Sequence, residues 1–537
     1  MSADDWWKHG TVYQIYPRSF QDSDGDGIGD LDGIRARLDH LVSLGIDAVW
    51  ISPIYPSPMA DFGYDISDFC AIDPRFGSLG GFDALVRECH ARGLKLILDF
   101  VPNHTSDQHP WFVQSRSARA SPRRDWYLWR DPAPDGGPPN NWLSNFGGPA
   151  WTLDPATGQY YCHSFLKAQP DLNWRNPEVR AAMYEVLRFW LRRGVDGFRV
   201  DVLYHLIKDD QFRDNPPNPD YADGDDPAHR WTPLYTADRP EMQQLVADMR
   251  RVVDAFSDAR SSRVLIGELY LPLARLVAYY GANAEGVLEG VQLPFNFQLI
   301  GTEWQARRID RLVRDYEAAL PAGAAPNWVL GNHDKPRIAS RVGAPMARLA
   351  AMLLLTLRGT PTLYYGDEIG MTDVEIPRAE VQDPFEKNQP GKGLGRDPQR
   401  TPMQWSGAPQ AGFTTGTPWL RLAPDWPACN VAAQTQDPAS MLALYRRLIA
   451  LRRAHPALNQ GAYEALDSQA DLLAYARVAQ GRRLMVLLNF GLGPATVSPD
   501  LVAGYTTVLA STAPARDALI DGSLVLAGCE GVVLAPA

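Results

Sequence analysis

Several features common in membrane and secreted proteins are missing from this sequence of 537 residues. Its longest apolar run, residues 349–357, is about half the length of a membrane-spanning helix. Residues 1–7 are acidic and aromatic, without the basic start and apolar run of a secretory signal. We therefore expect a cytoplasmic protein with no membrane partner.

Cysteine and positive charge are also scarce. The five cysteines are widely spaced and form no C-x-x-C pair, so neither a zinc site nor a disulfide framework is expected. The formal net charge of −11 repels phosphate backbones, so we expect no nucleic-acid partner. A small neutral substrate is compatible with this charge, and the protein is expected to be a monomer or a homodimer.

Short apolar runs alternate with amphipathic helical stretches along most of the chain, which predicts a parallel sheet covered by helices. The runs with strand character are residues 12–16, 48–52, 94–100, 195–200, 264–267, 287–295, 328–330 and 362–365. Helices are expected between them, for example at residues 31–44, 82–92, 178–193 and 243–256. Eight such strands favour a closed α/β barrel, the (β/α)₈ TIM barrel. An open doubly wound sheet is the alternative, but no G-x-G-x-x-G loop follows the first run.

The chain is too long for one compact core, so we expect more than one domain. Residues 105–173 are rich in Trp, Pro, Gly and Asn with little helical period, which predicts an irregular subdomain inserted after the third strand. Residues 457–537 contain short alternating runs, which predict a C-terminal antiparallel β domain resembling a sandwich. The barrel then comprises residues 1–104 and 174–456.

Acidic residues stand at or near the carboxyl ends of four predicted strands: Asp99, Asp201, Glu268 and Asp334. In a barrel these strand ends share one rim, where catalytic groups gather, so we expect the four acids to converge. The alternative is that each acid caps the helix that follows it. Because each of the four acids follows a run that resembles a buried strand, the pattern favours a catalytic site.

The neighbours of these acids suggest a division of labour. Arg199 and Asp201 are two residues apart on a strand and point the same way, and a cation lowers a carboxyl pKa, which suits a nucleophile. Glu268 follows apolar residues, and desolvation by such residues raises a carboxyl pKa, which suits a general acid. Retaining glycoside cleavage requires this pairing. His104 and His333 follow two of the strands and could hydrogen-bond sugar hydroxyls, or be ordinary loop histidines.

The segments 99–104 (DFVPNH), 197–201 (GFRVD) and 332–334 (NHD) together resemble the signatures of the α-amylase family, glycoside hydrolase family 13. The resemblance covers nearly the whole chain. It implies Asp201 as the nucleophile, Glu268 as the acid/base and Asp334 as a third acid that holds sugar hydroxyls. It further implies that Arg199 orients Asp201, and that His104 and His333 bind the sugar.

Three further segments, 169–173 (QPDLN), 59–65 (MADFGYD) and 396–405 (RDPQRTPMQW), resemble the oligo-1,6-glucosidase-like subgroup. In that subgroup Asp61 and Arg400 would clamp the non-reducing-end glucose, which gives a dead-end pocket and exo action. Tyr64 would stack on the sugar ring, and Phe165 is placed with the substrate-binding residues. These features predict an α-glucosidase that acts on maltose-type sugars, without an organic cofactor.

Other activities stay open at this point. Val202 follows the nucleophile, and in relatives valine there accompanies α-1,6 activity, whereas threonine or alanine accompanies α-1,4 activity. Attack by a sugar in place of water would give transglucosylation, as in trehalose synthase or isomaltulose synthase, although the Arg-Leu-Asp-Arg-Asp motif of the latter is absent. A non-catalytic scaffold is disfavoured because the acids are intact, and an aldolase is disfavoured because no strand-end lysine has an apolar setting.

An acidic loop precedes the first predicted barrel helix. Its alternating acids resemble the start of an EF-hand loop, but the closing glutamate is replaced by Gly33. The candidate ligands are the side chains of Asp22, Asp24, Asp26 and Asp30 and the carbonyl of Ile28. Clustered carboxylates repel one another unless a cation is bound. The resemblance implies a structural Ca²⁺, with Mg²⁺ as the alternative, and a solvated acidic turn is the other interpretation.

Overall fold

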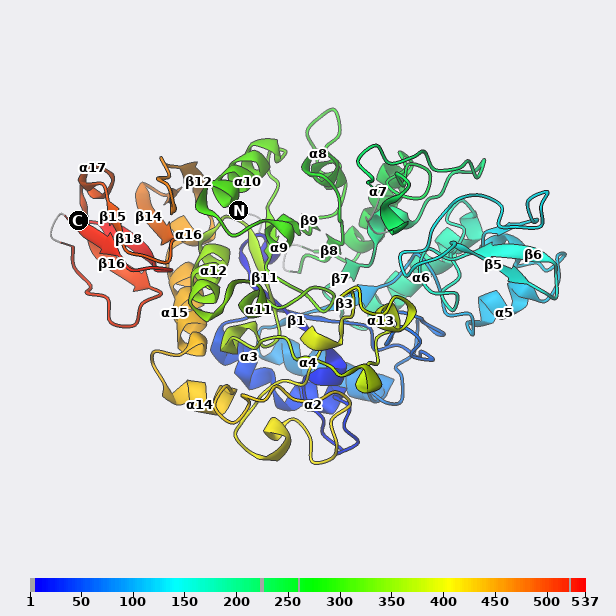
Figure 1. Cartoon of the computed structure of the whole chain (residues 1–537), viewed down its shortest axis with the longest axis horizontal. Coiled ribbons are helices and arrows are strands. Elements are labelled where there is room, and N and C mark those ends of the chain that lie inside the picture. Colours follow the sequence, from blue (N-terminus) through cyan, green and yellow to red (C-terminus); the bar gives the residue numbers. More distant parts are fainter. Residues whose placement is uncertain (1–4, 223–226, 259–260, 521–522) are drawn as a thin grey trace.

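In the computed structural model, which describes residues 5–222, 227–258, 261–520 and 523–537, the centre of the molecule is a closed barrel of eight parallel strands (Figure 1). The strands neighbour one another in the order β10-β11-β1-β2-β3-β7-β8-β9, and a parallel bridge from Asn296 to Trp328 joins the two ends of this series. Their bounds are β1 Val12–Ile15, β2 Ala48–Ile51, β3 Lys95–Phe100, β7 Gly197–Val200, β8 Val264–Gly267, β9 Leu293–Pro294, β10 Asn327–Val329 and β11 Thr360–Tyr364. The predicted barrel is confirmed.

The barrel strands are apolar on both faces because side chains fill the barrel inside and helices cover it outside. The covering helices include α2 Leu31–Ala36, α3 Leu38–Leu44, α4 Leu79–Ala91, α6 Pro177–Arg192, α7 Met242–Asp254, α10 Ala306–Ala319 and α12 Ala344–Thr356. In α6 the buried residues recur every three or four positions, at Val179, Met183, Val186, Leu187, Trp190 and Leu191. Asn176 caps this helix by accepting a hydrogen bond from the Glu178 amide, and Pro177 occupies the first turn.

Two sequence predictions differ from the structure in detail. The helix expected at residues 31–44 is divided at Arg37 (φ −108°, ψ 5°) into α2 and α3. The apolar run at 287–295 forms a strand only at β9, residues 293–294. Upstream of β9 the backbone folds against itself instead, because the Glu289 and Gly290 amides donate to the carbonyls of Gly281 and Tyr280.

The segment between β3 and α6 forms a small subdomain of its own. It contains α5 Pro110–Arg116 and an antiparallel sheet of β4 Trp129–Arg130, β6 Gln159–Cys162 and β5 Trp151–Asp154. A separate apolar cluster beneath this sheet includes Leu128, Trp142, Ala150, Trp151 and Cys162. Figure 1 shows this subdomain and the C-terminal sheet at opposite ends of the molecule.

The C-terminal part is an antiparallel β domain, as predicted. Its main sheet has the order β12-β13-β14-β18-β16, and β15 and β17 form a second, two-stranded sheet. The bounds are β12 Ala462–Ala465, β13 Leu472–Ala479, β14 Arg482–Asn489, β15 Ala495–Val497, β16 Tyr505–Ser511, β17 Leu524–Leu526 and β18 Gly531–Pro536. The helices α15 Met441–Ala454 and α16 Pro456–Asn459 connect it to the barrel. The domain boundaries given above stay predictions. Among the described helices, none has the length and apolar character needed to cross a bilayer.

Candidate active site

A pocket of about 330 Å³ opens at the carboxyl ends of the barrel strands. Asp201 directly follows β7, Glu268 directly follows β8, and Asp334 lies five residues beyond β10. The pocket is lined by Asp61, Tyr64, His104, Phe165, Asp201, Glu268, His333 and Asp334. The structure therefore brings the three proposed catalytic acids together with most of the predicted substrate-binding residues.

One guanidinium group organises the acids at the bottom of this pocket. Arg199 Nη1 lies 2.7 Å from both Asp99 Oδ1 and Asp201 Oδ1, and its Nη2 lies 2.8 Å from Glu268 Oε2. The Arg199 side chain is only 1% exposed, so these contacts replace its hydration. Arg199 points inward from the middle of β7 and positions Glu268 as well as Asp201.

Because three carboxylates share one cation, the pKa of Asp201 differs from the sequence expectation. Burial raises the pKa of Asp201, the Arg199 guanidinium opposes this shift, and the charges of Glu268 and Asp99 add to it, so that the net shift is upward. The pKa of Asp99 is likewise raised, to about 6, mainly by burial. Arg199 does lower the pKa of Asp201, as the sequence predicted, but burial and the charges of Glu268 and Asp99 outweigh it, so the expected net lowering is not found.

Val202 adds a backbone contact to the same cluster. Its φ of 36° and ψ of 45° are left-handed, an uncommon and strained conformation for a β-branched residue. This conformation directs the Val202 amide to Glu268, which it reaches at 2.8 Å (N to Oε2). Glu268 Oε2 is therefore held by a backbone N–H as well as by Arg199.

Asp334 lies against two arginines and the ring of His333. Arg400 Nη2 is 2.8 Å and Arg396 Nη1 is 3.3 Å from Asp334 Oδ1, and His333 Nε2 is 3.3 Å from Oδ2. Burial alone would raise the pKa of Asp334, but His333, Arg396 and Arg400 together hold it well below its usual range. Asp334 is thus an ionised acceptor beside the pocket, which suits a residue that binds sugar hydroxyls.

His333 is held in a stack of rings. Its ring lies parallel to that of Tyr64, with centroids 5.3 Å apart, and Tyr16 stacks 5.8 Å away. Its Nδ1 lies 2.8 Å from Gln14 Nε2, and burial lowers the pKa of His333 well below its usual value. The amide donor fixes Nδ1 as the acceptor, so the neutral ring carries its proton on Nε2, toward Asp334.

One end of the pocket is closed by a buried ion pair between Asp61 and Arg396, a residue to which the sequence analysis gave no role. Asp61 Oδ1 lies 2.6 Å from Arg396 Nη2, and Arg396 also contacts Asp383 at 2.6 Å. Arg400, which was expected to clamp the glucose together with Asp61, is completely buried and binds Asp334 and the His333 carbonyl. The difference arises because Arg396 and Arg400 begin and end one short 3₁₀ turn, which aims them at different acids.

Aromatic side chains form the remaining wall of the pocket. The Phe165 ring lies 5.2 Å from the His104 ring, and Phe146 makes an edge contact with Phe385 at 4.7 Å between centroids. Tyr204 and Tyr270 also line the pocket. Apolar faces of this kind suit the C–H surfaces of a pyranose ring.

Several of these residues were missed by sequence reasoning. Arg396, Tyr204, Tyr270, Phe146 and Phe385 were given no role, although Arg396 begins the 396–405 segment that carried the family resemblance. Asp99 was noted as a strand-end acid, and its contact with Arg199 became visible only in the structure. For the aromatic residues, the sequence carried no signal that separates a pocket wall from an ordinary core.

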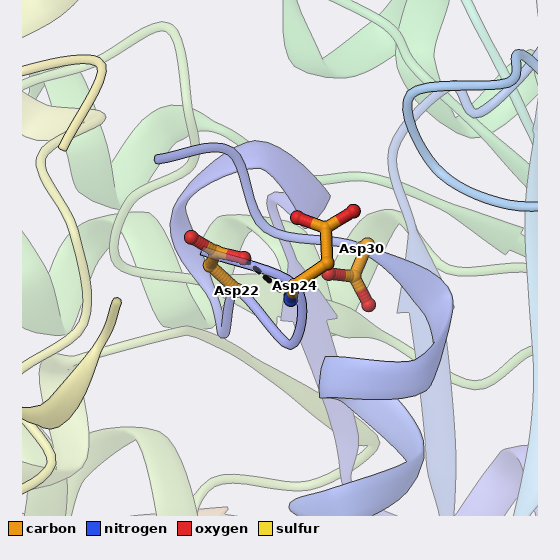
Figure 2. A group of neighbouring side chains, drawn as sticks. All are labelled: Asp22, Asp24 and Asp30. Carbon is orange, nitrogen blue, oxygen red and sulfur yellow. Dashed lines mark hydrogen bonds between the residues drawn. The ribbon is translucent and has the colours of Figure 1, made fainter. Parts of the chain in front are cut away.

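The acidic loop at residues 22–30 brings three of its four aspartates together. Ligand oxygens of Asp22, Asp24 and Asp30 lie within 4.8 Å of one another. Figure 2 shows the three side chains on this loop. Asp26 is not part of this group, and its Oδ1 accepts a hydrogen bond of 2.7 Å from the Ile28 amide. Ligation by Asp26 and by the Ile28 carbonyl therefore stays a prediction.

The donor set of this loop fits a hard divalent cation, because carboxylate oxygens are the ligands that Ca²⁺ and Mg²⁺ prefer. Burial raises the pKa of Asp26, and the charges of Asp24, Asp22 and Asp30 raise it further. That mutual repulsion is what a bound cation would relieve. Asp30 also caps α2 by accepting from the Gly33 amide at 2.7 Å, so an ion here would act on the first barrel helix.

The carboxyl ends of the barrel strands bring arginine-bound carboxylates together around a pocket lined with aromatic rings. These are the features of a glycoside hydrolase. Comparison with known proteins identifies the family. The family description "Alpha amylase, catalytic domain" matches residues 14–461, and the chain belongs to the alpha-amylase family. A domain of unknown function matches residues 459–533, which contain most of the C-terminal sheet.

Proteins similar to this chain include glucosidases and glucosyl-transferring enzymes. An alpha-glucosidase of Culex pipiens is 44% identical over 497 residues, covering 91% of this chain and 82% of the relative. An oligo-1,6-glucosidase of Halalkalibacterium halodurans is 40% identical over 524 residues, covering 90% of each chain. Among solved structures, the alpha-glucosyl transfer enzyme XgtA has a TM-score of 0.92 at 40% identity and 99% coverage of both chains. The trehalulose synthase MutB from Pseudomonas mesoacidophila has a TM-score of 0.90 at 36% identity, covering 99% of this chain and 100% of its own.

Proposed function

We propose that this glycoside hydrolase is a retaining, exo-acting α-glucosidase that releases glucose from the non-reducing end of maltose-type oligosaccharides. The observation that carries the proposal is the binding of Asp201 and Glu268 to one guanidinium, at 2.7 and 2.8 Å, at the bottom of a pocket. Retaining glycosidases need two carboxyl groups that are close enough to act on the same anomeric carbon.

In the proposed mechanism, Asp201 attacks the anomeric carbon while Glu268 protonates the glycosidic oxygen, so that the leaving sugar departs as an alcohol. The glucose is then bonded to Asp201 as an ester. Glu268, now ionised, takes a proton from a water molecule that attacks the same carbon and releases glucose. Asp334, with its lowered pKa, would accept hydrogen bonds from ring hydroxyls in both steps.

The test is the stereochemistry and the distribution of products. Proton NMR of maltose cleavage should show that the first new glucose from the non-reducing end is the α-anomer. Initial rates on maltose, isomaltose, sucrose and maltotriose should rank maltose first. Initial release of β-glucose would exclude retention, and faster cleavage of internal bonds in longer chains would exclude exo action.

The second candidate is an oligo-1,6-glucosidase. Val202 lines the pocket beside Glu268, and valine at this position favours α-1,6 linkages in relatives. A relative of that name is 40% identical to this chain. In the same assay, isomaltose would be cleaved faster than maltose.

We also propose transglucosylation as a side activity, because a sugar hydroxyl can replace water in the second step. The likeness to the alpha-glucosyl transfer enzyme XgtA, at 40% identity, supports this proposal. At high maltose concentration the protein should form trisaccharides. We also propose a cytoplasmic location, which would suit such short substrates. If only glucose appears at every maltose concentration, the transfer proposal is wrong.

The proposed clamp can be tested at Arg396. Replacement by leucine leaves Asp61 and Asp383 buried without their shared cation, so kcat/KM for maltose should fall by about 100-fold. Steady-state kinetics on maltose and on maltotetraose would measure the effect. Arg193→Leu removes an ion pair of 2.8 Å with Asp83 on the barrel exterior and should leave kcat/KM unchanged. Equal kinetics for both variants would contradict the assignment of the clamp to Arg396.

We propose that Asp22, Asp24 and Asp30 hold a structural Ca²⁺. After EDTA treatment, adding Ca²⁺ to a hundredfold excess over its Kd should raise the Tm by about 2 °C, given the unfolding entropy of a chain of this size. Differential scanning calorimetry measures this shift. Asp24→Asn changes an exposed ligand and should remove the response to Ca²⁺. An unchanged Tm in the wild type, or an equal response in the variant, would contradict the site.

A further inference from the structure

Behind the pocket wall lies a buried ion pair that has no part in the chemistry described so far. Lys208 follows β7 by eight residues and is 4% exposed. Its Nζ lies 2.8 Å from Asp171 Oδ2 and donates to Asn103 Oδ1 and to the His205 carbonyl, both at 2.7 Å. The ammonium group thus uses all three of its hydrogens. Burial alone would raise the pKa of Asp171, but Lys208 and the hydroxyl and amide of Ser164 hold it below its usual range.

This ion pair acts on the side-chain amide of Asn103. Lys208 has only donors, so the atom of Asn103 that faces it must be the oxygen. The ionised Asp171 has only acceptors, so the atom that faces it, 3.0 Å from Asp171 Oδ1, must be the nitrogen. A cation and an anion on opposite sides therefore leave the amide one orientation, since a flip would place like groups together at both ends.

The second hydrogen of Asn103 Nδ2 points to His104. The Nδ2 atom lies 3.1 Å from His104 Nδ1. A neutral imidazole has one protonated and one bare nitrogen, and burial lowers the pKa of His104 to about 4, so its ring is neutral near pH 7. An obligatory donor beside Nδ1 makes Nδ1 the bare nitrogen, which leaves the proton on Nε2.

The other side of the His104 ring does not make this choice by itself. Its Nε2 has an acceptor, the Tyr64 carbonyl, at 3.2 Å and a donor, Gln169 Nε2, at 3.1 Å. Gln169 is itself oriented, because its Oε1 accepts from the Leu166 amide and its Nε2 donates to Asp61 at 3.1 Å. Either tautomer of His104 could satisfy one of these two neighbours, so the Nδ1 side decides.

We propose that Lys208 and Asp171 are positioning residues that fix the Asn103 amide and thereby hold His104 as the tautomer protonated on Nε2. The inference rests on the proposed function, in which His104 lines the glucose pocket and binds a sugar hydroxyl. Its consequence is that the one N–H of the His104 ring lies on Nε2, where it faces the Tyr64 carbonyl and can be shared with a sugar hydroxyl. With the proton on Nδ1, Nε2 would present a lone pair to both the Tyr64 carbonyl and the sugar.

The tautomer can be observed without any substrate. In protein labelled with ¹⁵N-histidine, a directly bonded N–H correlation from His104 Nε2 is expected, assigned by its loss in His104→Ala. In Lys208→Met the correlation should be lost or divided between both ring nitrogens. Because Lys208→Met leaves Asp171 buried without its cation and could prevent folding, the double variant Lys208→Met/Asp171→Asn removes both charges and should give the same result.

The control is an ion pair that lies within the inserted subdomain. Arg116→Met/Asp154→Asn removes a pair of 2.9 Å whose buried carboxylate also accepts from the Thr157 hydroxyl, and the Nε2 correlation should persist. On maltose, the Lys208/Asp171 variant should lose about tenfold in kcat/KM through a rise in KM, the size expected for one substrate hydrogen bond, whereas the control should not. A wild-type proton on Nδ1, or an unchanged Nε2 correlation in the folded double variant, would overturn the proposal. Failure of maltose cleavage in the wild type would instead overturn the proposed function, because the tautomer measurement does not depend on it.

Discussion

Asp201→Asn is expected to lower kcat for maltose by about 10⁴-fold or more, as in other enzymes that lose their nucleophile. An amide cannot form the glucosyl ester, and Arg199 would still hold the side chain in place. The Tm should stay the same or rise slightly, because the change removes one of three carboxylates that share a single guanidinium. Stopped-flow or overnight product assays and calorimetry would measure the two quantities.

The informative control is Asp99→Asn. Asp99 binds the same arginine at 2.7 Å but is not among the residues that line the pocket, so it cannot reach the sugar. Its replacement alters the charge of the cluster without removing a reacting atom, and kcat should fall by only about tenfold. If Asp201→Asn lost no more activity than Asp99→Asn, Asp201 would be a member of the charge cluster and not the nucleophile.

Glu268→Gln is expected to separate the two halves of the reaction. On maltose, kcat should fall by about 10²- to 10⁴-fold because the leaving sugar is no longer protonated. On p-nitrophenyl α-glucoside the first step should be largely preserved, because nitrophenolate leaves without a proton. The second step should remain slow, so a burst of nitrophenol is expected in rapid-mixing experiments.

Azide provides the matching rescue. As an anion it needs no general base, so it should restore turnover of the aryl glucoside by Glu268→Gln and yield α-glucosyl azide, the product of net retention. Asp201→Asn should not be rescued in this way with retention. Equal losses of Glu268→Gln on maltose and on the aryl glucoside would show that Glu268 does not act as the general acid.

Much of the architecture could be predicted because its signals are local. Residues 94–100 and 264–267 are short, apolar and followed by polar residues, and both became barrel strands close to their predicted bounds. The run at 287–295 failed as a strand over most of its length, because tight backbone contacts near Gly290 depend on residues 279–281 upstream. Apolar composition alone cannot distinguish these two outcomes.

The position of the acids belongs to what the sequence determined by itself. Asp201 and Glu268 follow parallel strands, and all carboxyl ends of a parallel barrel share one rim, so local pattern and topology suffice to bring them together. The partners of each charge were decided only by the tertiary structure. That Arg396 pairs with Asp61 and that Lys208 orients Asn103 depend on where loops return to the barrel rim. That Arg199 serves three carboxylates depends on β3, β7 and β8 being neighbours in the sheet. Ion pairs form between side chains that happen to be neighbours in space, and sequence periodicity carries no record of those distances.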